Sequence, residues 1–261
     1  MPIITMLTDF GLKDGNVGVL KGVIWKIAPE AQIADLSHLI PPQDVREGAL
    51  ILSRSAPFFP PGTVHLAVVD PGVGTSRRPL AARLGEHFFV LPDNGLITLL
   101  LERAERDQQA IEFVHLNQPQ YWLPSVSHVF HGRDIFAPCA AHLVNGVLLQ
   151  ELGTPISDPQ RLEFPVPRRT ERGLQGEIIH IDHFGNLSTS IRRQHLGEPV
   201  GVRVRLRGVE IKGMVKTFGE CSPGELIALY GSTDYLLICV VNGSAAHRLG
   251  AQVGDLVEVT W

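Results

Sequence analysis

The stretch Val64–Gly74, "VHLAVVDPGVG", joins an apolar run to an aspartate and a glycine-rich turn. Its first six residues have the length and composition of a buried strand, which ends at Asp70. Similar short apolar segments occur at 3–7, 32–37, 88–93 and 111–116, and segments with helical spacing lie between or after them at 17–28, 44–56, 96–106 and 135–144. This alternation predicts an α/β layered N-terminal domain with a largely parallel sheet.

The second part of the chain has a different pattern. Residues 153–173 contain four prolines and no clear period, which is typical of a connection between domains. Short alternating segments with turn glycines follow at 176–182, 200–208, 209–215, 226–230, 235–241 and 255–261. They predict a small C-terminal β-barrel domain. We therefore expect an N-terminal domain over residues 1–160 and a C-terminal domain over 161–261.

The composition excludes several classes of protein. The chain has 261 residues, of which 44% are hydrophobic and 19% charged, and its net charge is −4. These values predict a soluble globular protein without a nucleic-acid or membrane partner. The N-terminus begins with a strand-like run rather than a signal peptide, so a cytoplasmic location is expected. Three cysteines without C-x-x-C spacing favour neither disulfides nor zinc.

The stretch "TDFGLKDGN" (8–16) follows the first predicted strand and contains Asp9, Asp14 and Asn16. Loops beyond the carboxyl ends of parallel strands are where ligands bind in open α/β sheets. These polar side chains suit hydroxyl or amine groups. The alternative is a solvated turn held by its own Asx hydrogen bonds. A divalent metal lacks further ligands at suitable spacing, so no metal is expected.

Two further stretches of the first domain carry candidate residues. Asp70 ends its strand, and Gly72 and Gly74 allow a close approach to a ligand. The phosphate-loop pattern is missing, and the alternative is a simple turn into the next strand, "PLAARLG". In "HGRDIFAP" (131–138), His131 stands at a predicted helix start, where the helix dipole should lower its pKa. The alternative is that Asp134 merely caps this helix.

In the second domain, "IDHFGNLSTSI" (181–191) contains Asp182, Phe184 and Asn186. An amide beside an aromatic ring suits an adenine-type base, because the amide matches the polar edge of the base while the ring stacks. The alternative is an ordinary turn. The stretch "YGSTDYLLICVVNGSAA" (230–246) adds Ser232, Asn242 and Ser244 as candidates.

Together these stretches, with "PDNGL" (92–96) and "VNGSAA" (241–246), resemble the S-adenosyl-L-methionine (SAM) hydroxide adenosyltransferases, or SAM hydrolases, which are relatives of fluorinase and chlorinase. The resemblance covers essentially the whole chain. It implies an α/β domain followed by a β-barrel and a homotrimer whose site lies between one subunit's N-terminal domain and its neighbour's C-terminal domain. It also implies hydrolysis of SAM to adenosine and L-methionine, with no cofactor and no metal.

Residue roles follow from the same resemblance. Asp70, Arg77 and His131 would position a water or hydroxide, although the neighbouring Arg78 leaves the choice of arginine open. Asp9 would hold the ribose hydroxyls. The methionine end would lie near Asp14, Asn16, Asp182 and Ser232, and the adenine near Phe184, Asn186, Ser244 and Ala245.

Departures from the halogenases distinguish the two branches. The related halogenases carry a tyrosine in place of Asp70, and a tyrosine and a serine in place of His131 and Gly132. They also have an inserted loop before the segment that corresponds to residues 81–95. Water is therefore expected as the nucleophile rather than halide. Gln43 replaces a tryptophan and Thr233 an arginine. Two other functions stay open at this point: a non-catalytic SAM or adenosine sensor, and a metal-dependent hydrolase using Asp9, Asp14 and Asp70.

Overall fold

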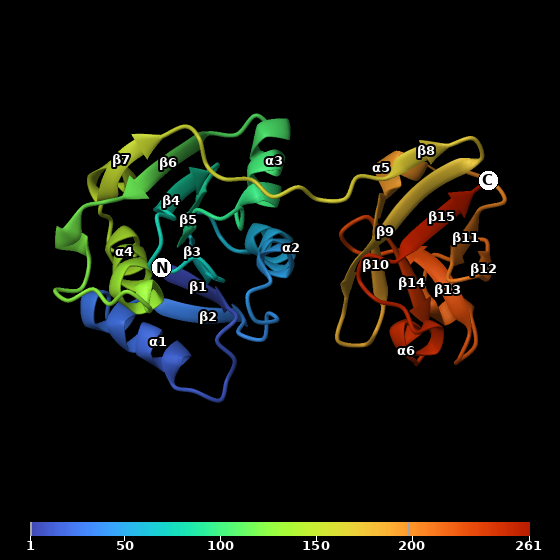
Figure 1. Ribbon diagram of the computed structural model, residues 1–261, viewed down its shortest axis with the longest axis horizontal. Coiled ribbons are helices and arrows are strands. Elements are labelled where there is room, and N and C mark those ends of the chain that lie inside the picture. The colour runs from blue at the N-terminus through green and yellow to red at the C-terminus, as the bar shows by residue number, and fades with distance from the viewer. Residues whose placement is uncertain (1, 198) are drawn as a thin grey trace. The chain divides into compact units, whose positions relative to one another are not determined.

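The structure is a computed structural model that describes residues 2–197 and 199–261. The chain divides into two compact units, Met1–Leu162 and Glu163–Trp261 (Figure 1). The division falls inside the proline-rich stretch 153–173. Within that stretch, Gly153–Ile156 form strand β7 and Arg168–Thr170 form strand β8. Each unit therefore takes a short strand from the sequence that joins them.

The first unit is built on a seven-stranded sheet with the order β2-β1-β3-β5-β4-β6-β7. Its other strands are β1 (Ile3–Thr8), β2 (Gln32–Ser37), β3 (Val64–Val68), β4 (Pro79–Leu84), β5 (His87–Pro92) and β6 (Ile111–Leu116). Strands β2, β1, β3 and β5 run parallel to one another, and β4, β6 and β7 add an antiparallel edge. The predicted α/β fold with a largely parallel sheet is confirmed.

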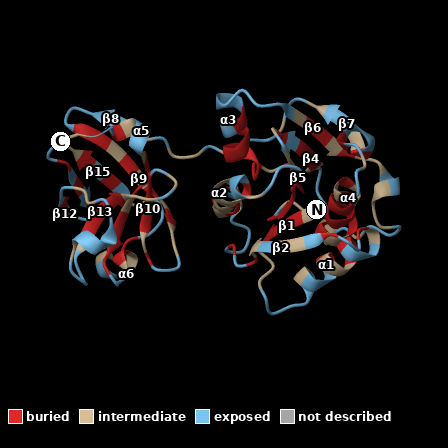
Figure 2. Ribbon diagram, turned by 180° about the vertical axis from the view of Figure 1, so that it is seen from behind, coloured by how far each residue is buried: buried red, intermediate tan, exposed pale blue. Residues whose placement is uncertain are grey.

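Helices cover both faces of this sheet (Figure 1). Helices α1 (Asn16–Ile27) and α4 (Ala137–Val144) pack together on one face, and α2 (Val45–Ser55) and α3 (Thr98–Arg106) pack together on the other. Strand β3 is buried at all five positions, and its neighbour β1, which is mostly red in Figure 2, is buried at every position except its first. The central strands are thus a rigid support for the loops that follow them.

The parallel strands β1 and β3 end at the same edge of the sheet. Thr8 pairs with Val68, so the loops that begin at Asp9 and Asp70 leave the sheet side by side. Asn94, in the loop after β5, donates a hydrogen bond from Nδ2 to the Val69 carbonyl at 2.8 Å. The sheet therefore brings the two predicted acidic loops to one place.

The second unit is an antiparallel barrel with the strand order β12-β11-β15-β9-β10-β14-β13, to which β8 adds on β9. Its strands are β9 (Gly173–Ile181), β10 (Leu187–Arg192), β11 (Arg203–Leu206), β12 (Val209–Lys212), β13 (Leu226–Tyr230), β14 (Tyr235–Val240) and β15 (Leu256–Thr260), with short helices α5 (Arg193–Leu196) and α6 (Ala245–Leu249). The Val215 N–H donates to the Ala228 carbonyl at 3.0 Å and joins the chain after β12 to β13. This contact nearly closes the barrel, as predicted.

The described residues include no helix that is both long enough and apolar enough to cross a membrane.

Candidate functional site

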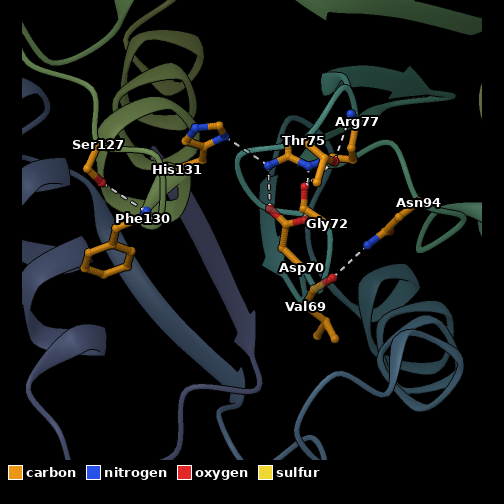
Figure 3. Close-up of polar contacts among 9 residues, drawn as sticks. All are labelled: Val69, Asp70, Gly72, Thr75, Arg77, Asn94, Ser127, Phe130 and His131. Atoms are coloured by element: carbon orange, nitrogen blue, oxygen red, sulfur yellow. Dashed lines mark hydrogen bonds and ion pairs between the residues drawn. The ribbon is translucent and has the colours of Figure 1, made fainter.

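Three side chains from two loops meet beside the end of β3: Asp70 and Arg77 from the loop between β3 and β4, and His131 from the segment before α4 (Figure 3). Arg77 donates from Nε to Asp70 Oδ1 at 3.0 Å and from Nη2 to Asp70 Oδ2 at 2.6 Å. The same Nη2 lies 3.0 Å from His131 Nδ1. The Asp70 and Arg77 side chains are only 5% and 7% exposed. The structure therefore brings Asp70, Arg77 and His131 into one connected cluster, in which the ion pair is buried and His131 is half-buried.

The neighbouring Arg78 points to a different set of partners. It pairs with Asp93 at 2.7 Å and with Asp158 at 2.9 Å, and it also donates to the Asp158 carbonyl. These contacts tie β4 to the chain that leaves the first unit. Arg77, and not Arg78, thus belongs to the cluster with Asp70.

The hydrogen bond from Arg77 fixes the state of the His131 ring. A guanidinium can only donate, so His131 Nδ1 must accept and the neutral ring carries its proton on Nε2. Burial, and then the charge of Arg77, lower the pKa of His131 below its ordinary value of 6.5. The predicted direction is thus found, but its causes are burial and Arg77 rather than a helix dipole. At neutral pH, His131 Nε2–H is a hydrogen-bond donor.

Burial also acts on the ion pair itself. It raises the pKa of Asp70 above the ordinary value, against the opposing charge and hydrogen bonds of Arg77. Burial also lowers the pKa of Arg77, against the opposing charge and hydrogen bonds of Asp70. The two-pronged contact with the guanidinium keeps Asp70 ionised at neutral pH, because a protonated carboxyl could not accept both bonds equally well. Asp70 is therefore an ionised carboxylate that is more basic than an exposed aspartate.

His131 is followed by a π-helical turn at Gly132–Phe136, which leads into α4. Asp134 in this turn is fully buried and accepts hydrogen bonds from the Ser127 N–H and from Arg133 Nε. Asp134 does not cap this helix, the alternative considered from the sequence, because its carboxylate binds the preceding loop instead. The turn holds the 127–131 loop in place, and such turns often occur at functional sites.

The loop after Asp70 makes a close backbone contact with the loop before His131. Gly74 has a φ of 77°, and a Cβ there would lie 2.3 Å from the His128 carbonyl oxygen. Only glycine allows this approach. The glycine predicted to permit a close ligand thus permits a close neighbouring loop, and this contact sets the separation of Arg77 and His131.

The remaining candidates of the first unit lie on the loop after β1. Asp9 Oδ2 accepts a hydrogen bond from the Gln43 N–H at 2.8 Å. Phe10 packs edge-on against Phe130, with 5.8 Å between the ring centroids, so this loop also contacts the segment that carries His131. Asp14 and Asn16 are exposed at the start of α1. The structure brings Asp9 to the edge where Asp70 lies and leaves Asp14 and Asn16 at the surface.

The second unit contains a cavity of about 790 Å³. Its lining includes five of the predicted residues: Asp182, Phe184, Asn186, Ser232 and Asn242. Asp182 organises the turn between β9 and β10, since its Oδ1 accepts from the N–H groups of Phe184 and Asn186 and its Oδ2 accepts from Asn186 Nδ2. Phe184, which follows in this turn, is 72% exposed.

Ser244 and Ala245 lie directly beside this turn. A Cβ at Gly185 would come within 2.0 Å of Ser244 Oγ, and the Ala246 N–H donates to the Gly185 carbonyl at 3.0 Å. Ser244 itself caps α6 by accepting from the His247 N–H. The predicted adenine residues therefore lie together at this turn, but Ala245 is fully buried, and neither Ser244 nor Ala245 lines the cavity.

The cavity also includes two residues that no sequence motif indicated, Lys216 and Phe218 (40% exposed). Tyr230, the first residue of the stretch 230–246, lines it as well. They come from the chain after β12 and from the end of β13, so only the closure of the barrel brings them next to the turn at Asp182. The one signal in the sequence that could have indicated this part of the cavity is Phe218, an aromatic residue in the chain after β12.

Among the described residues, no group of three or more His, Cys, Asp or Glu side chains is placed to hold a metal ion.

Comparison with known families gives a consistent result for both units. The model of the SAM hydroxide adenosyltransferase N-terminal domain matches residues 4–153, and the model of the C-terminal domain matches residues 176–258.

Individual proteins extend this similarity over the whole chain. An "(R)-S-adenosyl-L-methionine hydrolase" of Salinispora tropica is 40% identical over 263 residues, covering 99% of this chain and 98% of that protein. A "Fluorinase" of Actinoplanes sp. is 30% identical over 294 residues, covering 99% and 97%. A solved structure described as an uncharacterized conserved protein from Thermotoga maritima superposes with a TM-score of 0.91 at 37% identity, covering 99% of this chain and all of that one.

Proposed function

The chain belongs to the SAM hydroxide adenosyltransferase family, and we propose that it hydrolyses SAM to adenosine and L-methionine. The observation that carries this proposal is the hydrogen-bonded cluster of Asp70, Arg77 and His131, whose ion pair is buried. An aspartate, an arginine and a neutral histidine suit water as the nucleophile. A halide, by contrast, would meet the negative charge of Asp70.

The reaction needs little from the protein beyond a well-aimed nucleophile. The sulfonium makes methionine a good leaving group, so a water oxygen can form its bond to ribose C5′ while the C5′–S bond breaks. The electron pair of that bond stays on sulfur as a neutral thioether. The water loses one proton, which passes to a base and then to solvent. Attack in line with the breaking bond predicts inversion at C5′.

Each member of the cluster then has a distinct part. Asp70 is the general base, because burial raises the pKa of its carboxyl and so strengthens it as a proton acceptor. His131 offers Nε2–H to the water oxygen and aims the lone pair, since its Nδ1 is already occupied by Arg77. Arg77 holds both groups and favours hydroxide character in the water. General-base help contributes about 10²- to 10⁴-fold.

The other predicted residues would bind the substrate. Asp9 has one oxygen bound to Gln43, and its other oxygen can accept from the ribose hydroxyls. Phe184 and Phe218 offer exposed rings for stacking on adenine, and Asn186 offers its amide to the base edge. Asp14, Asn16, Asp182 and Ser232 would serve the methionine end. No cofactor takes part, because SAM itself is the substrate.

Because the two residue sets belong to different units, we also propose a homotrimer in which neighbouring subunits complete each site. The family resemblance supports this assembly. Sedimentation equilibrium should give the mass of three 28.6 kDa chains, and a monomer mass would contradict it.

Incubation of the purified protein with SAM in ¹⁸O-labelled water tests the proposed reaction. The expected products are labelled adenosine and unlabelled methionine, identified by chromatography and mass spectrometry. A chelator should leave the rate unchanged. Binding of SAM without any product over hours would indicate a sensor instead, and label in methionine would contradict attack at C5′.

The pH dependence of kcat/KM should have a single acid limb. As the pH falls, Asp70 becomes protonated and loses its role as base. His131 becomes protonated below its lowered pKa, so its Nδ1 can no longer accept from Arg77. Activity should therefore be flat at neutral and alkaline pH and decline only below pH 6.5, the ordinary histidine value.

Steady-state rates of the wild type and of His131→Gln across this range would check it. In the variant, the part of the acid limb due to histidine should disappear. A wild-type profile that still rises between pH 7 and 8 would exclude Asp70 as the base.

A further inference from the structure

The cavity in the second unit contains one pair of opposite charges. Among the described residues that line it, Asp182 is the only carboxylate and Lys216 the only cationic side chain. Under the proposed function, on which this inference rests, the methionine end of SAM carries an ammonium and a carboxylate on the same carbon. A single negative group and a single positive group are what such a zwitterion requires.

Asp182 is already held in place for the ammonium. Its Oδ1 accepts two backbone hydrogen bonds at 2.9 and 2.8 Å, and its Oδ2 accepts one from Asn186 Nδ2 at 2.8 Å. Each carboxylate oxygen has two lone pairs, so Oδ2 can accept one further bond. The carboxylate is therefore fixed in position and has room for one more donor.

Lys216 has the complementary arrangement, with an anchored backbone and a free side chain. Its N–H donates to Glu220 Oε1 at 3.1 Å, and the Val215 N–H beside it donates to the Ala228 carbonyl at 3.0 Å. No carboxylate of the described chain forms an ion pair with its ammonium, although it is exposed and lines the cavity.

Arg193, a cation beside the cavity residue Tyr230, already has partners elsewhere. Arg193 lies 4.2 Å over the Tyr230 ring, but it pairs with Asp234 at 3.3 Å and is outside the cavity lining. Lys216 is thus the cation that the cavity offers to an incoming anion.

We propose that Lys216 binds the α-carboxylate of the methionine moiety and so makes the enzyme select SAM over adenosyl sulfonium compounds that lack this carboxylate. Ser232 at the same cavity can donate a second hydrogen bond to it. Lys216 is then a specificity residue, distant from the chemistry at C5′.

The test compares two substrates, SAM and decarboxylated SAM, in the wild type and in two variants. Lys216→Met removes the charge but keeps the length of the side chain, and Lys216→Arg keeps the charge. We expect the wild type to prefer SAM. Lys216→Met should lower kcat/KM for SAM by about 10- to 100-fold, the range for a hydrogen bond to a charged group, and leave decarboxylated SAM unchanged. Lys216→Arg should retain most of the preference.

Lys212→Met is the matched control, since Lys212 is exposed on β12 and outside the cavity lining. Lys212→Met should leave kcat/KM unchanged for both SAM and decarboxylated SAM. If kcat/KM fell equally for both substrates in Lys216→Met, Lys216 would have a structural role and the inference would be overturned. The inference would also be overturned if Lys216→Met kept the wild-type preference for SAM, or if the wild type showed no preference for SAM over decarboxylated SAM. Failure of the proposed function is a separate result: the wild type would then release no adenosine from SAM.

Discussion

Asp70→Asn is expected to lower kcat for SAM hydrolysis by at least about 10³-fold while leaving SAM and adenosine binding measurable. The substitution keeps the size of the side chain and removes the proposed general base, and general-base catalysis accounts for about 10²- to 10⁴-fold. It also places an amide N–H against the guanidinium of Arg77, so the aim of His131 is weakened as well. Adenosine release by chromatography and substrate binding by calorimetry would measure the two effects.

Asp158→Asn is a suitable control, because Asp158 also pairs with an arginine but is 74% exposed and outside the cluster. It should retain wild-type turnover. Loss of one partner of a buried ion pair costs about 3–5 kcal/mol, so thermal unfolding must be followed to show that Asp70→Asn is folded when assayed. Turnover of a folded Asp70→Asn protein within tenfold of the wild type would exclude Asp70 as the base.

Gly74→Ala is expected to have the second-largest effect, on both stability and catalysis. At a φ of 77° an alanine costs about 1–2 kcal/mol, and its Cβ would stand 2.3 Å from the His128 carbonyl oxygen. The two loops must then separate, which moves Arg77 away from His131. A misplacement of about 1 Å can cost 10²-fold in rate, so kcat/KM should fall by about that factor. Steady-state kinetics and the unfolding temperature would show both losses.

Gly72→Ala provides the matched control in the same loop. A Cβ at Gly72 would meet its nearest atoms, on Arg77 and Thr75, at 3.5 Å or more, which is ordinary contact. This variant should keep nearly wild-type activity and stability. Equal behaviour of the two variants would mean that the contact between Gly74 and His128 does not control the cluster.

Much of the fold could be predicted because its signals are local. The stretch 64–69 was expected to form a buried strand, and Val64–Val68 form one in the centre of the sheet. Strand β10 (Leu187–Arg192) was not predicted, because Ser188, Thr189 and Ser190 are buried polar residues without an alternating pattern. Burial of such residues depends on hydrogen bonds that only the folded barrel supplies.

The candidate site could be predicted less directly. Arg77 and His131 are 54 positions apart, and nothing local in either segment requires their contact. Their proximity depends on the order of the strands and on one glycine that lets two loops touch. Residue types and strand ends alone indicated a ligand-binding α/β enzyme. The family resemblance was needed to select Asp70, Arg77 and His131 as the catalytic candidates. Lys216 and Phe218 belong to no motif and enter the cavity only because the barrel closes.

The π-helical turn at Gly132–Phe136 limits how this segment can change during evolution. Such a turn holds one residue more than the regular helix it interrupts, so deletion of a single residue would restore a standard helix at little cost to folding. Everything before the deletion would then rotate by about 100° around the helix axis, which would carry the His131 ring away from Arg77. Insertions and deletions here should therefore be selected against even where individual side chains are free to vary.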